Sequence, residues 1–503
     1  MRCVALSLLC IVAVAQTATA ADHPNIIVIL VDDLGYGDLS CSGATAVNTP
    51  NIDRIAAEGC RFTDGHSSAA TCTPSRYALL TGEYAWRRKD TGIAPGDAGA
   101  IILPGRTTVA SLLKSAGYRS TVVGKWHLGL GRDKPDWNGR ITPGPIDIGF
   151  DECFLMPATG DRVPCVYVEN DHVVGLDPAD PISVSFSGPF GDEPTGLKNP
   201  ELLKMAWDHG HNATIINGIS RIGFMTGGRS ARWIDEDMAD VFTAKAVHFI
   251  DRHVANHQDQ PFFLFFNPHD IHVPRAPHQR FAGSTQLGPR GDAIRQLDWS
   301  VGEILHCLDQ HQITNNTLLI FTSDNGPVLN DGYRDQAAEL NGNHRPAGPW
   351  RGGKYSAFEG GTRVPFLARW PGHIQAGTTS DALVCQIDFL ATFAELTGEN
   401  LPPDAGPDSQ KQLRALTGAD RHGRDHLVEQ AATLSLRQGH WKFIEPSRGQ
   451  ALNRQVNIET GNNPEPQLYD LQSDPGETRN LAAAESRRLA EMQQLLNQIR
   501  KPR

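Results

Sequence analysis

Four short runs of hydrophobic residues, each followed directly by polar residues, punctuate the chain. They cover residues 25–31, 120–124, 262–266 and 317–323. The hydrophobic positions are continuous rather than alternating, which is typical of strands that are buried on both faces of a mainly parallel sheet. We therefore predict four central strands of one sheet.

Between these runs the hydrophobic positions recur with the period of a helix. The pattern predicts helices over residues 50–57, 108–116, 237–254 and 293–308. Strands that alternate with helices indicate an α/β fold, here a large mixed, mainly parallel sheet with helices on both faces. Functional crevices in such sheets lie beyond the carboxyl ends of the strands. All four predicted strands end in reactive polar residues, so the pattern favours an enzyme.

The last hundred residues follow a different pattern. Residues 399–412 are rich in Pro, Asp and Gly, which indicates a linker. Beyond it, residues 441–444 and 467–471 resemble short strands and residues 480–499 resemble a closing helix. We expect a catalytic domain over residues 21–400 and a small α+β subdomain over residues 401–503.

The first twenty residues have the features of an export signal. Arg2 precedes an apolar stretch over residues 4–15, and Ala-Thr-Ala at residues 18–20 provides a small-residue cleavage site. The stretch is too short to span a bilayer, and no later segment offers 18 unbroken apolar residues. We predict a signal peptide over residues 1–20, no membrane span, and a periplasmic or secreted protein.

The charge balance excludes one class of partner. Lys plus Arg number 46 against 57 Asp plus Glu, a formal net charge of -11. Affinity for nucleic acid depends on a basic surface, so we expect no nucleic-acid partner.

Oxygen ligands stand at the ends of two predicted strands. Asp32 and Asp33 follow the first strand, and Asp324 and Asn325 follow the last. Adjacent acids are common on surfaces and Asp-Asn-Gly often marks a turn, but the position directly after buried strands distinguishes these residues. Such a set suits a hard divalent cation, calcium in preference to magnesium.

A specific motif lies between these strand ends. The chain reads CTPSR at residues 72–76 and LTG at residues 80–82. It also reads GKWHLG at 124–129, DNG at 324–326, EGGTRVP at 359–365, LYDL at 468–471 and DPGETRNL at 474–481. In these motifs the chain resembles the sulfatase family of the alkaline-phosphatase-like superfamily, from residue 25 to about residue 481. The resemblance implies that fold and the hydrolysis of sulfate monoesters.

The resemblance also implies an unusual nucleophile. In the family the motif cysteine, here Cys72, is oxidised to Cα-formylglycine by a formylglycine-generating enzyme or an anaerobic sulfatase-maturing enzyme. The hydrated aldehyde binds the metal and attacks sulfur, with Asp324 as its base, so that covalent catalysis divides one difficult step into two. His127 then deprotonates the second hydroxyl, which releases sulfate.

Four further residues take roles from the resemblance. Arg76 holds the aldehyde, Lys125 and Lys354 bind the sulfate oxygens, and His272 is the acid that protonates the leaving group. His269 is a nearby rival for the last role. Without the resemblance, nothing in the sequence would distinguish His272 from a hydrogen-bonded structural histidine, or Lys354 from a solvated surface lysine.

The cysteine count suggests disulfides. Seven cysteines lie beyond the leader, an odd number in a compartment that permits disulfides. If Cys72 is modified, six remain. Cys153 and Cys165 are the most plausible local pair because they are twelve residues apart and flank a loop.

Three loops outside the shared motifs are candidates for substrate selection, over residues 157–172, 207–232 and 331–351. They carry side chains suited to sugar hydroxyls or anionic groups: Arg162, His209, His211, Arg334, His344 and Arg345. We predict an exo-acting carbohydrate sulfatase that removes sulfate from O6 of a terminal galactose or N-acetylgalactosamine. The net negative charge disfavours binding a long polyanion along the surface.

Two alternatives remain at this stage. A phosphate or phosphonate ester hydrolase of the same superfamily would typically use Ser or Thr as its nucleophile. An inactive protein that binds sulfated glycans would tolerate loss of Cys72, Arg76 or Lys125, yet every expected position is filled.

Overall fold

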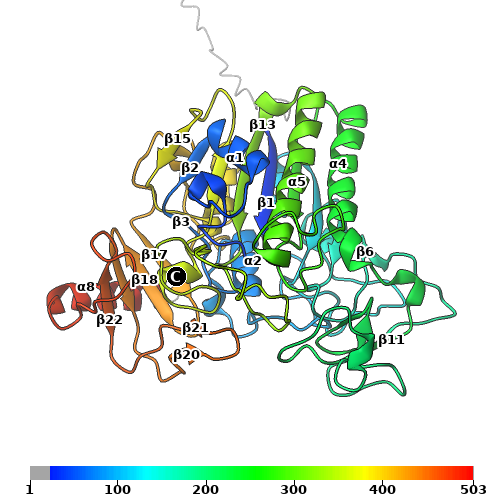
Figure 1. Cartoon of the computed structure of the whole chain (residues 1–503). Coiled ribbons are helices and arrows are strands. Elements are labelled where there is room, and N and C mark those ends of the chain that lie inside the picture. The colour runs from blue at the N-terminus through cyan, green and yellow to red at the C-terminus, as the bar shows by residue number, and fades with distance from the viewer. Residues whose placement is uncertain (1–22, 502–503) are drawn as a thin grey trace, which may run out of the picture.

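A ten-stranded sheet forms the centre of the protein, in the order β15-β2-β14-β13-β1-β12-β4-β5-β6-β7 (Figure 1). The computed structural model describes residues 23–501, so the predicted signal peptide lies outside the described residues. The inner strands are parallel: β13 (Thr317–Ser323), β1 (Asn25–Val31), β12 (Phe262–Asn267), β4 (Arg119–Lys125) and β5 (Glu152–Met156). The four hydrophobic runs are therefore strands, and the predicted mainly parallel sheet is confirmed.

The outer strands make the sheet mixed. β14 (Phe366–Arg369) pairs antiparallel with β13 and with β2 (Cys60–Phe62), which β15 (Thr378–Ser380) extends in parallel. At the other edge, β6 (Val168–Glu169) and β7 (His172–Val173) add an antiparallel hairpin. Within residues 23–501 there are also four small two-stranded sheets: β3 (Gly65–His66) with β16 (Val384–Cys385), β8 (Ser183–Ser185) with β11 (Phe224–Thr226), β9 (Ile215–Ile216) with β10 (Ile219–Ser220), and β20 (Leu452–Asn453) with β21 (Ile458–Glu459).

Helices cover both faces of the sheet. Adjacent residues of a strand point to opposite faces, so an apolar run such as β12 has hydrophobic side chains to bury on each side. Phe262 of β12 contacts Phe249 of α4, whereas Phe263 contacts Phe393 of α6. One group contains α1 (Pro50–Ala57), α4 (Met238–Asn256) and α5 (Gly288–Gln310), and the other contains α2 (Cys72–Thr81), α3 (Val109–Ser115) and α6 (Phe389–Thr397). The four predicted helices are present, and Thr108 caps α3 through a reciprocal bond with Ser111.

The chain ends in an antiparallel sheet of four strands (Figure 1, orange to red). Its order is β17 (His426–Gln430), β18 (Leu434–Gln438), β19 (Trp441–Ile444) and β22 (Gln467–Asp470). Helix α8 (Ser486–Arg500) packs on β18 and β19 and begins six residues later than predicted. Residues 399–412 contain neither helix nor strand, as expected for a connection, and the short α7 (Leu413–Leu416) follows them.

The predicted disulfide between Cys153 and Cys165 is wrong. All seven cysteines of the described residues are free. Each of the two thiols is buried with its own backbone acceptor: Cys153 Sγ donates to the carbonyl of Asn170 at 3.3 Å, and Cys165 Sγ to that of Arg162 at 3.7 Å. Closeness in sequence did not bring the sulfur atoms together, because strand β5 directs Cys153 toward the hairpin that follows it.

None of the helices in residues 23–501 combines the length and the apolar character needed to cross a bilayer.

Candidate active site

The sheet brings the predicted oxygen ligands together at one edge. Strands β1 and β13 are adjacent and parallel, with Val31 opposite Ser323, so the residues after them meet at the carboxyl ends of the strands. Asp32, Asp33 and Asp324 each place a carboxylate oxygen within 4.8 Å of the others. These carboxylates and Asn325 are fully buried.

The residues present fit a divalent cation. Buried side-chain oxygens usually have hydrogen-bond partners, yet Oδ1 of Asp32, of Asp324 and of Asn325 has none among the described residues. Asn325 donates its Nδ2 to Asp33 Oδ1 at 2.7 Å, which leaves its own oxygen available. Unsatisfied carboxylate and amide oxygens are the donor set that calcium and magnesium prefer.

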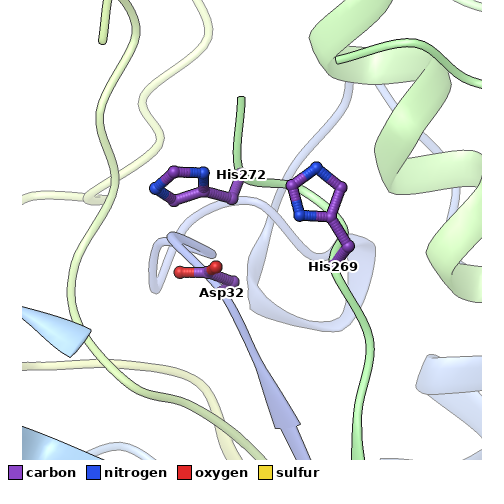
Figure 2. A group of neighbouring side chains, drawn as sticks. All are labelled: Asp32, His269 and His272. Carbon is purple, nitrogen blue, oxygen red and sulfur yellow. The ribbon is translucent and has the colours of Figure 1, made fainter. Parts of the chain in front are cut away.

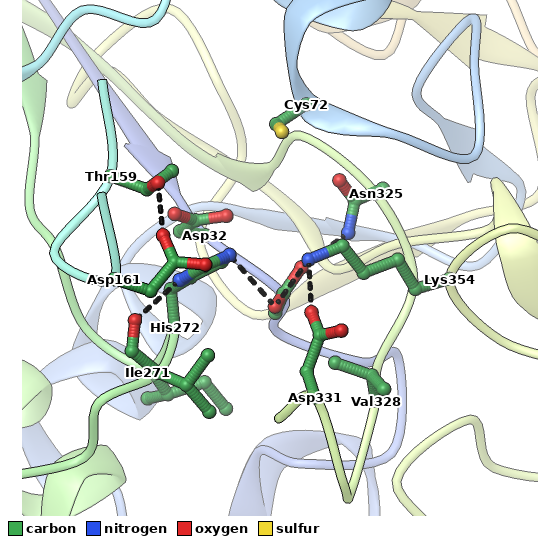
Figure 3. A network of polar contacts seen from close by, with 12 residues as sticks. Asp32, Cys72, Thr159, Asp161, Ile271, His272, Asn325, Val328, Asp331 and Lys354 are labelled. Carbon is green, nitrogen blue, oxygen red and sulfur yellow. Dashed lines mark hydrogen bonds and ion pairs between the residues drawn. The ribbon is translucent and has the colours of Figure 1, made fainter. Parts of the chain in front are cut away.

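Cys72 is the first residue of α2 and is 2% exposed. Figure 3 shows its sulfur facing the same space as Asp32, Asn325 and Lys354. Burial raises the pKa of this thiol, although Lys125 and Lys354 oppose the shift. A helix N-terminus beside these lysines is a favourable place for an anion.

Three cationic side chains surround the acidic cluster. Lys125 Nζ forms an ion pair with Asp32, and Arg76 Nε donates to Asp324 Oδ2 at 2.8 Å. Burial opposes ionisation of Asp32, but the nearby cations, Lys125 foremost among them, together outweigh burial and lower the pKa of that carboxyl. Burial and the neighbouring Asp32 together raise the pKa of Asp324. The two adjacent carboxylates thus differ in their affinity for protons.

Lys354 lies on the other side of the cluster. Its Nζ donates to Asp33 Oδ2 at 2.9 Å and to Asp331 Oδ2 at 2.8 Å (Figure 3). Burial disfavours the ammonium ion, but the two carboxylates prevail and hold the pKa of Lys354 well above its usual value. The lysine is therefore a buried permanent cation rather than a surface residue.

The hydrogen bonds of His127 define its tautomer. Nε2 lies 2.9 Å from the carbonyl oxygen of Ala94 and must donate to it, so Nδ1 carries the lone pair in the neutral ring. Nδ1 lies 3.2 Å from Cys72 Sγ. Burial, with Lys125 nearby, holds the pKa of His127 well below its usual value. The ring is therefore neutral, and the lone pair of Nδ1 faces residue 72.

Two histidines lie next to Asp32 (Figure 2). His272 donates its Nδ1 to the carbonyl of Val273 at 2.7 Å, and its Nε2 lies 3.8 Å from Asp33 Oδ2. Neither ring nitrogen of His269 has a hydrogen-bond partner among the described residues. Burial and the neighbouring His272 lower the pKa of His269 to about 4. His272 is thus the ring whose free end is oriented within the acidic cluster.

Two of the predicted substrate residues converge on Asp161. Arg162 Nη1 donates to Asp161 Oδ1 at 2.9 Å and to Thr159 Oγ1 at 2.6 Å. His211 Nε2 lies 2.9 Å from Asp161 Oδ2. Asp161 interacts electrostatically with His272, so this polar cluster adjoins the site (Figure 3).

The side chains of the other four predicted substrate residues do not contact Asp161, although the carbonyl of His209 accepts a hydrogen bond from His211 Nδ1 at 2.6 Å. His209 lies 3.2 Å from Asp208, and Arg334, 70% exposed, lies 3.7 Å from the same residue. Arg345 is exposed. The side chain of His344 is only 3% exposed and is paired with Asp38 at 2.8 Å, so it has little surface left for a ligand.

Sequence reasoning missed two acids at the site, Asp161 and Asp331. Asp161 is 3% exposed and pairs with His211, fifty positions further along the chain, and Asp331 shares Lys354 with Asp33. The sequence offered one indication of these acids, their location in the candidate loops. Asp161 directly precedes the predicted Arg162, and Asp331 is the first residue of the loop over residues 331–351.

A buried oxygen-donor set beside a helix-initiating cysteine and several cations is suited to the hydrolysis of anionic esters. The sequence model of the sulfatase family matches residues 24–399, which is most of the chain. A second model, described as the C-terminal part of N-sulphoglucosamine sulphohydrolase, matches residues 353–502. The chain belongs to the sulfatase family and is a sulfuric ester hydrolase, as its motifs predicted.

Known relatives agree along nearly the whole length. The chain is 54% identical to an N-acetylgalactosamine-6-O-sulfatase of Bacteroides thetaiotaomicron, over 95% of this chain and 94% of that protein. It is 31% identical to human N-acetylgalactosamine-6-sulfatase, over 95% and 85% of the two chains. A solved structure from work on the metabolism of multiple glycosaminoglycans by Bacteroides thetaiotaomicron superposes with a TM-score of 0.93 at 54% identity, over 95% of this chain and 99% of that one.

Proposed function

We propose that the protein removes the 6-O-sulfate of a terminal N-acetylgalactosamine, using Cα-formylglycine made from Cys72 as nucleophile and calcium as the bound metal. The relative at 54% identity is named N-acetylgalactosamine-6-O-sulfatase, which supports N-acetylgalactosamine 6-sulfate as the substrate. The signal peptide predicted over residues 1–20 supports a glycan substrate, because an exported enzyme would meet extracellular glycans.

The observation that carries this proposal is the polar cluster of Thr159, Asp161, Arg162 and His211 beside the acidic site. It presents a guanidinium, an imidazole and a carboxylate whose hydrogen bonds hold one another in place. Sugar recognition needs a few oriented donors and acceptors of this kind. We assign the cluster to the hydroxyl groups of the sulfated sugar.

The metal would be held by Asp32, Asp33, Asp324 and Asn325, with residue 72 as a further ligand. A bound divalent cation would offset the charge on the sulfate oxygens and favour an anionic nucleophile. Lys125 and Lys354 are the side chains that bind the sulfate oxygens, because both are buried cations at this edge. Arg76, which donates to Asp324 and to the carbonyl of Lys125, orients residue 72 and its neighbours.

Two histidines move the protons. The unprotonated Nδ1 of His127 faces residue 72, so His127 is the base that later accepts a proton there. His272 is fixed through Nδ1, and its Nε2 end provides the proton for the sugar oxygen when the sulfur–oxygen bond breaks. Oxidation of Cys72 supplies an oxygen nucleophile where the thiol stands in the unmodified chain.

A substrate panel tests the proposal. The enzyme, produced with a maturing enzyme, is offered the 6-sulfates of N-acetylgalactosamine, galactose and N-acetylglucosamine, the 4-sulfate of N-acetylgalactosamine, and an aryl sulfate. We expect the highest kcat/KM for N-acetylgalactosamine 6-sulfate. Preference for the 4-sulfate, or turnover of the aryl sulfate alone, would contradict the specificity.

A second comparison tests exo action. Chondroitin oligosaccharides carrying 6-sulfate only at the non-reducing end should be desulfated, whereas those with the same sulfate at an internal residue should not. Equal release of sulfate from the terminally and the internally sulfated oligosaccharides would contradict exo action. It would leave the assignment of sulfatase activity unchanged.

A further inference from the structure

A second group of metal-ligating side chains lies at the opposite edge of the sheet from the active site. A pocket of about 290 Å³ is lined there by Asn25 and Phe262, the first residues of β1 and β12, and by His311. The active site follows the last residues of the same strands. Whatever binds beside His311 is therefore separated from the catalytic residues by the length of the sheet.

The group consists of three different donors from two helices. Asp251 belongs to α4, Cys307 to the last turn of α5, and His311 directly follows α5. His311 Nε2 lies 2.7 Å from Asp251 Oδ1, and Cys307 Sγ lies 3.6 Å from the same oxygen. One ligand atom from each residue lies within 4.8 Å of the others.

Helical geometry explains why these side chains meet. Cys307 and His311 are four residues apart, a spacing that places two side chains on the same face of a helix. Helices α4 and α5 stand side by side (Figure 1), which brings Asp251 against that face. The sulfur is buried, whereas the side chains of His311 and Asp251 are 29% and 51% exposed, so an ion from solvent has access.

The local charge favours a cation. Within residues 23–501 the only ion pair of Asp251 is with His311, and no lysine or arginine neutralises the carboxylate. The same side chains offer sulfur, nitrogen and oxygen in place of the all-oxygen set of the active site. Mixed sulfur and nitrogen ligands select zinc over calcium or magnesium.

We propose that Asp251, Cys307 and His311 form a zinc site that connects α4 to α5. Zinc replaces the thiol proton of Cys307, which is released to solvent, and binds His311 through the nitrogen that now faces Asp251. Three protein ligands leave the fourth tetrahedral position to water. Since the site joins two helices that cover one face of the sheet, the bound ion stabilises the folded state.

Cobalt, a spectroscopic substitute for zinc, tests the site. The enzyme is stripped of transition metals, kept in excess calcium to occupy the acidic site, and titrated with Co²⁺. We expect one equivalent of tetrahedral Co²⁺ with a sulfur-to-metal charge-transfer band, which added Zn²⁺ abolishes. The band should be lost in Cys307→Ser and in His311→Ala, and kept in the matched control Cys41→Ser, which alters another free thiol.

Two results would overturn the proposal. One is the absence of a thiolate band in the parent enzyme. The other is a band that persists in Cys307→Ser, for example because Cys72 binds the ion, which Cys72→Ser would then reveal. Sulfatase activity should be the same in Cys307→Ser and in the parent, so the outcome is independent of the proposed function.

Discussion

At the scale of single residues, the chemistry depends on where Cys72 stands. As the first residue of α2 it is buried, faces Nδ1 of His127, and lies among Lys125, Lys354 and the acidic cluster. An ordinary buried thiol is a poor nucleophile in such a place, because burial raises its pKa. The proposed conversion to an oxygen nucleophile would remove that obstacle.

Replacing Cys72 should therefore abolish catalysis while the fold persists. In Cys72→Ala we expect kcat/KM for the sugar sulfate to fall more than about a thousand-fold, because the covalent step is lost. Cys60→Ala, which removes another buried thiol, is the control and should keep its activity. Substantial turnover by Cys72→Ala, measured by sulfate release, would contradict the proposed nucleophile.

Arg162 should affect sugars and aryl sulfates differently. Its guanidinium is held by Asp161 and Thr159 in the cluster we assign to the sugar. In Arg162→Ala we expect kcat/KM for N-acetylgalactosamine 6-sulfate to fall about a hundred-fold, because buried polar groups lose their partner. Turnover of an aryl sulfate should change little.

Arg334→Ala is the matched control for that comparison. Its side chain is 70% exposed, and its ion pair, Nε to Asp208 Oδ1 at 3.7 Å, is long and therefore weak. We expect both substrates to be turned over nearly as in the parent enzyme. Equal losses on the sugar and the aryl sulfate in Arg162→Ala would instead assign Arg162 to the sulfate group.

At the scale of elements, buried ion pairs connect the C-terminal sheet to the large domain. His66 of β3 lies 2.9 Å from Glu429 of β17 through Nδ1 and 2.8 Å from Asp64 through Nε2. Lys442 of β19 contacts Glu429 and Glu359 at 2.8 and 3.0 Å. Breaking one partner of a buried pair leaves an uncompensated charge, which is costly.

The His66 contacts should make stability depend on pH. Burial alone would lower the pKa of His66, but the hydrogen bonds that the protonated ring donates to the carboxylates of Asp64 and Glu429 raise it above its usual value of about 6.5. A raised histidine pKa stabilises the fold below about pH 6.5, and this contribution is lost as the pH rises through the folded-state pKa. His66→Gln should therefore lower the free energy of unfolding by about 3 kcal/mol at about pH 6, and by less at about pH 9.

Urea denaturation at the two pH values measures this difference. His172→Gln is the matched control, since His172 pairs with Asp171 but its side chain is 62% exposed. We expect that change to alter stability by less than about 0.5 kcal/mol at either pH. A loss in His66→Gln that is the same at both pH values would show that packing, not charge, accounts for it.

At the scale of the whole molecule, the proposed metal site joins the middle strands of the sheet. Asp32 and Asp33 follow β1 and Asp324 follows β13, so an ion bound there would stabilise the folded chain by mass action. At calcium concentrations near a hundred times Kd, the stabilisation should be about 2.7 kcal/mol. Chelation should lower the Tm and the activity together, and calcium should restore both.

Variants at the acidic cluster sharpen that test. Asp324→Asn should remove the calcium dependence of the Tm, whereas Asp192→Asn, at an exposed acid, should keep it. Elemental analysis of the purified protein completes the measurement. A Tm that is the same before and after chelation, and the same in Asp324→Asn as in the parent enzyme, would contradict the metal assignment.

The sequence by itself determined what depends on near neighbours. Continuous hydrophobic runs predicted β1, β4, β12 and β13, because strands buried on both faces require them. The CTPSR motif and the acids after β1 and β13 identified the family and the edge of the sheet that carries the site. These features are local, so the order of residues along the chain contains them.

Only the tertiary structure decided which distant residues share a site. Strand order placed Asp33 against Asn325, and loop routes brought His211 to Asp161. The same routes buried His344 against Asp38 and kept Cys153 and Cys165 apart as free thiols. Loops carry no periodic pattern of burial, so their paths follow from packing against the whole molecule, and no short stretch of sequence encodes that packing.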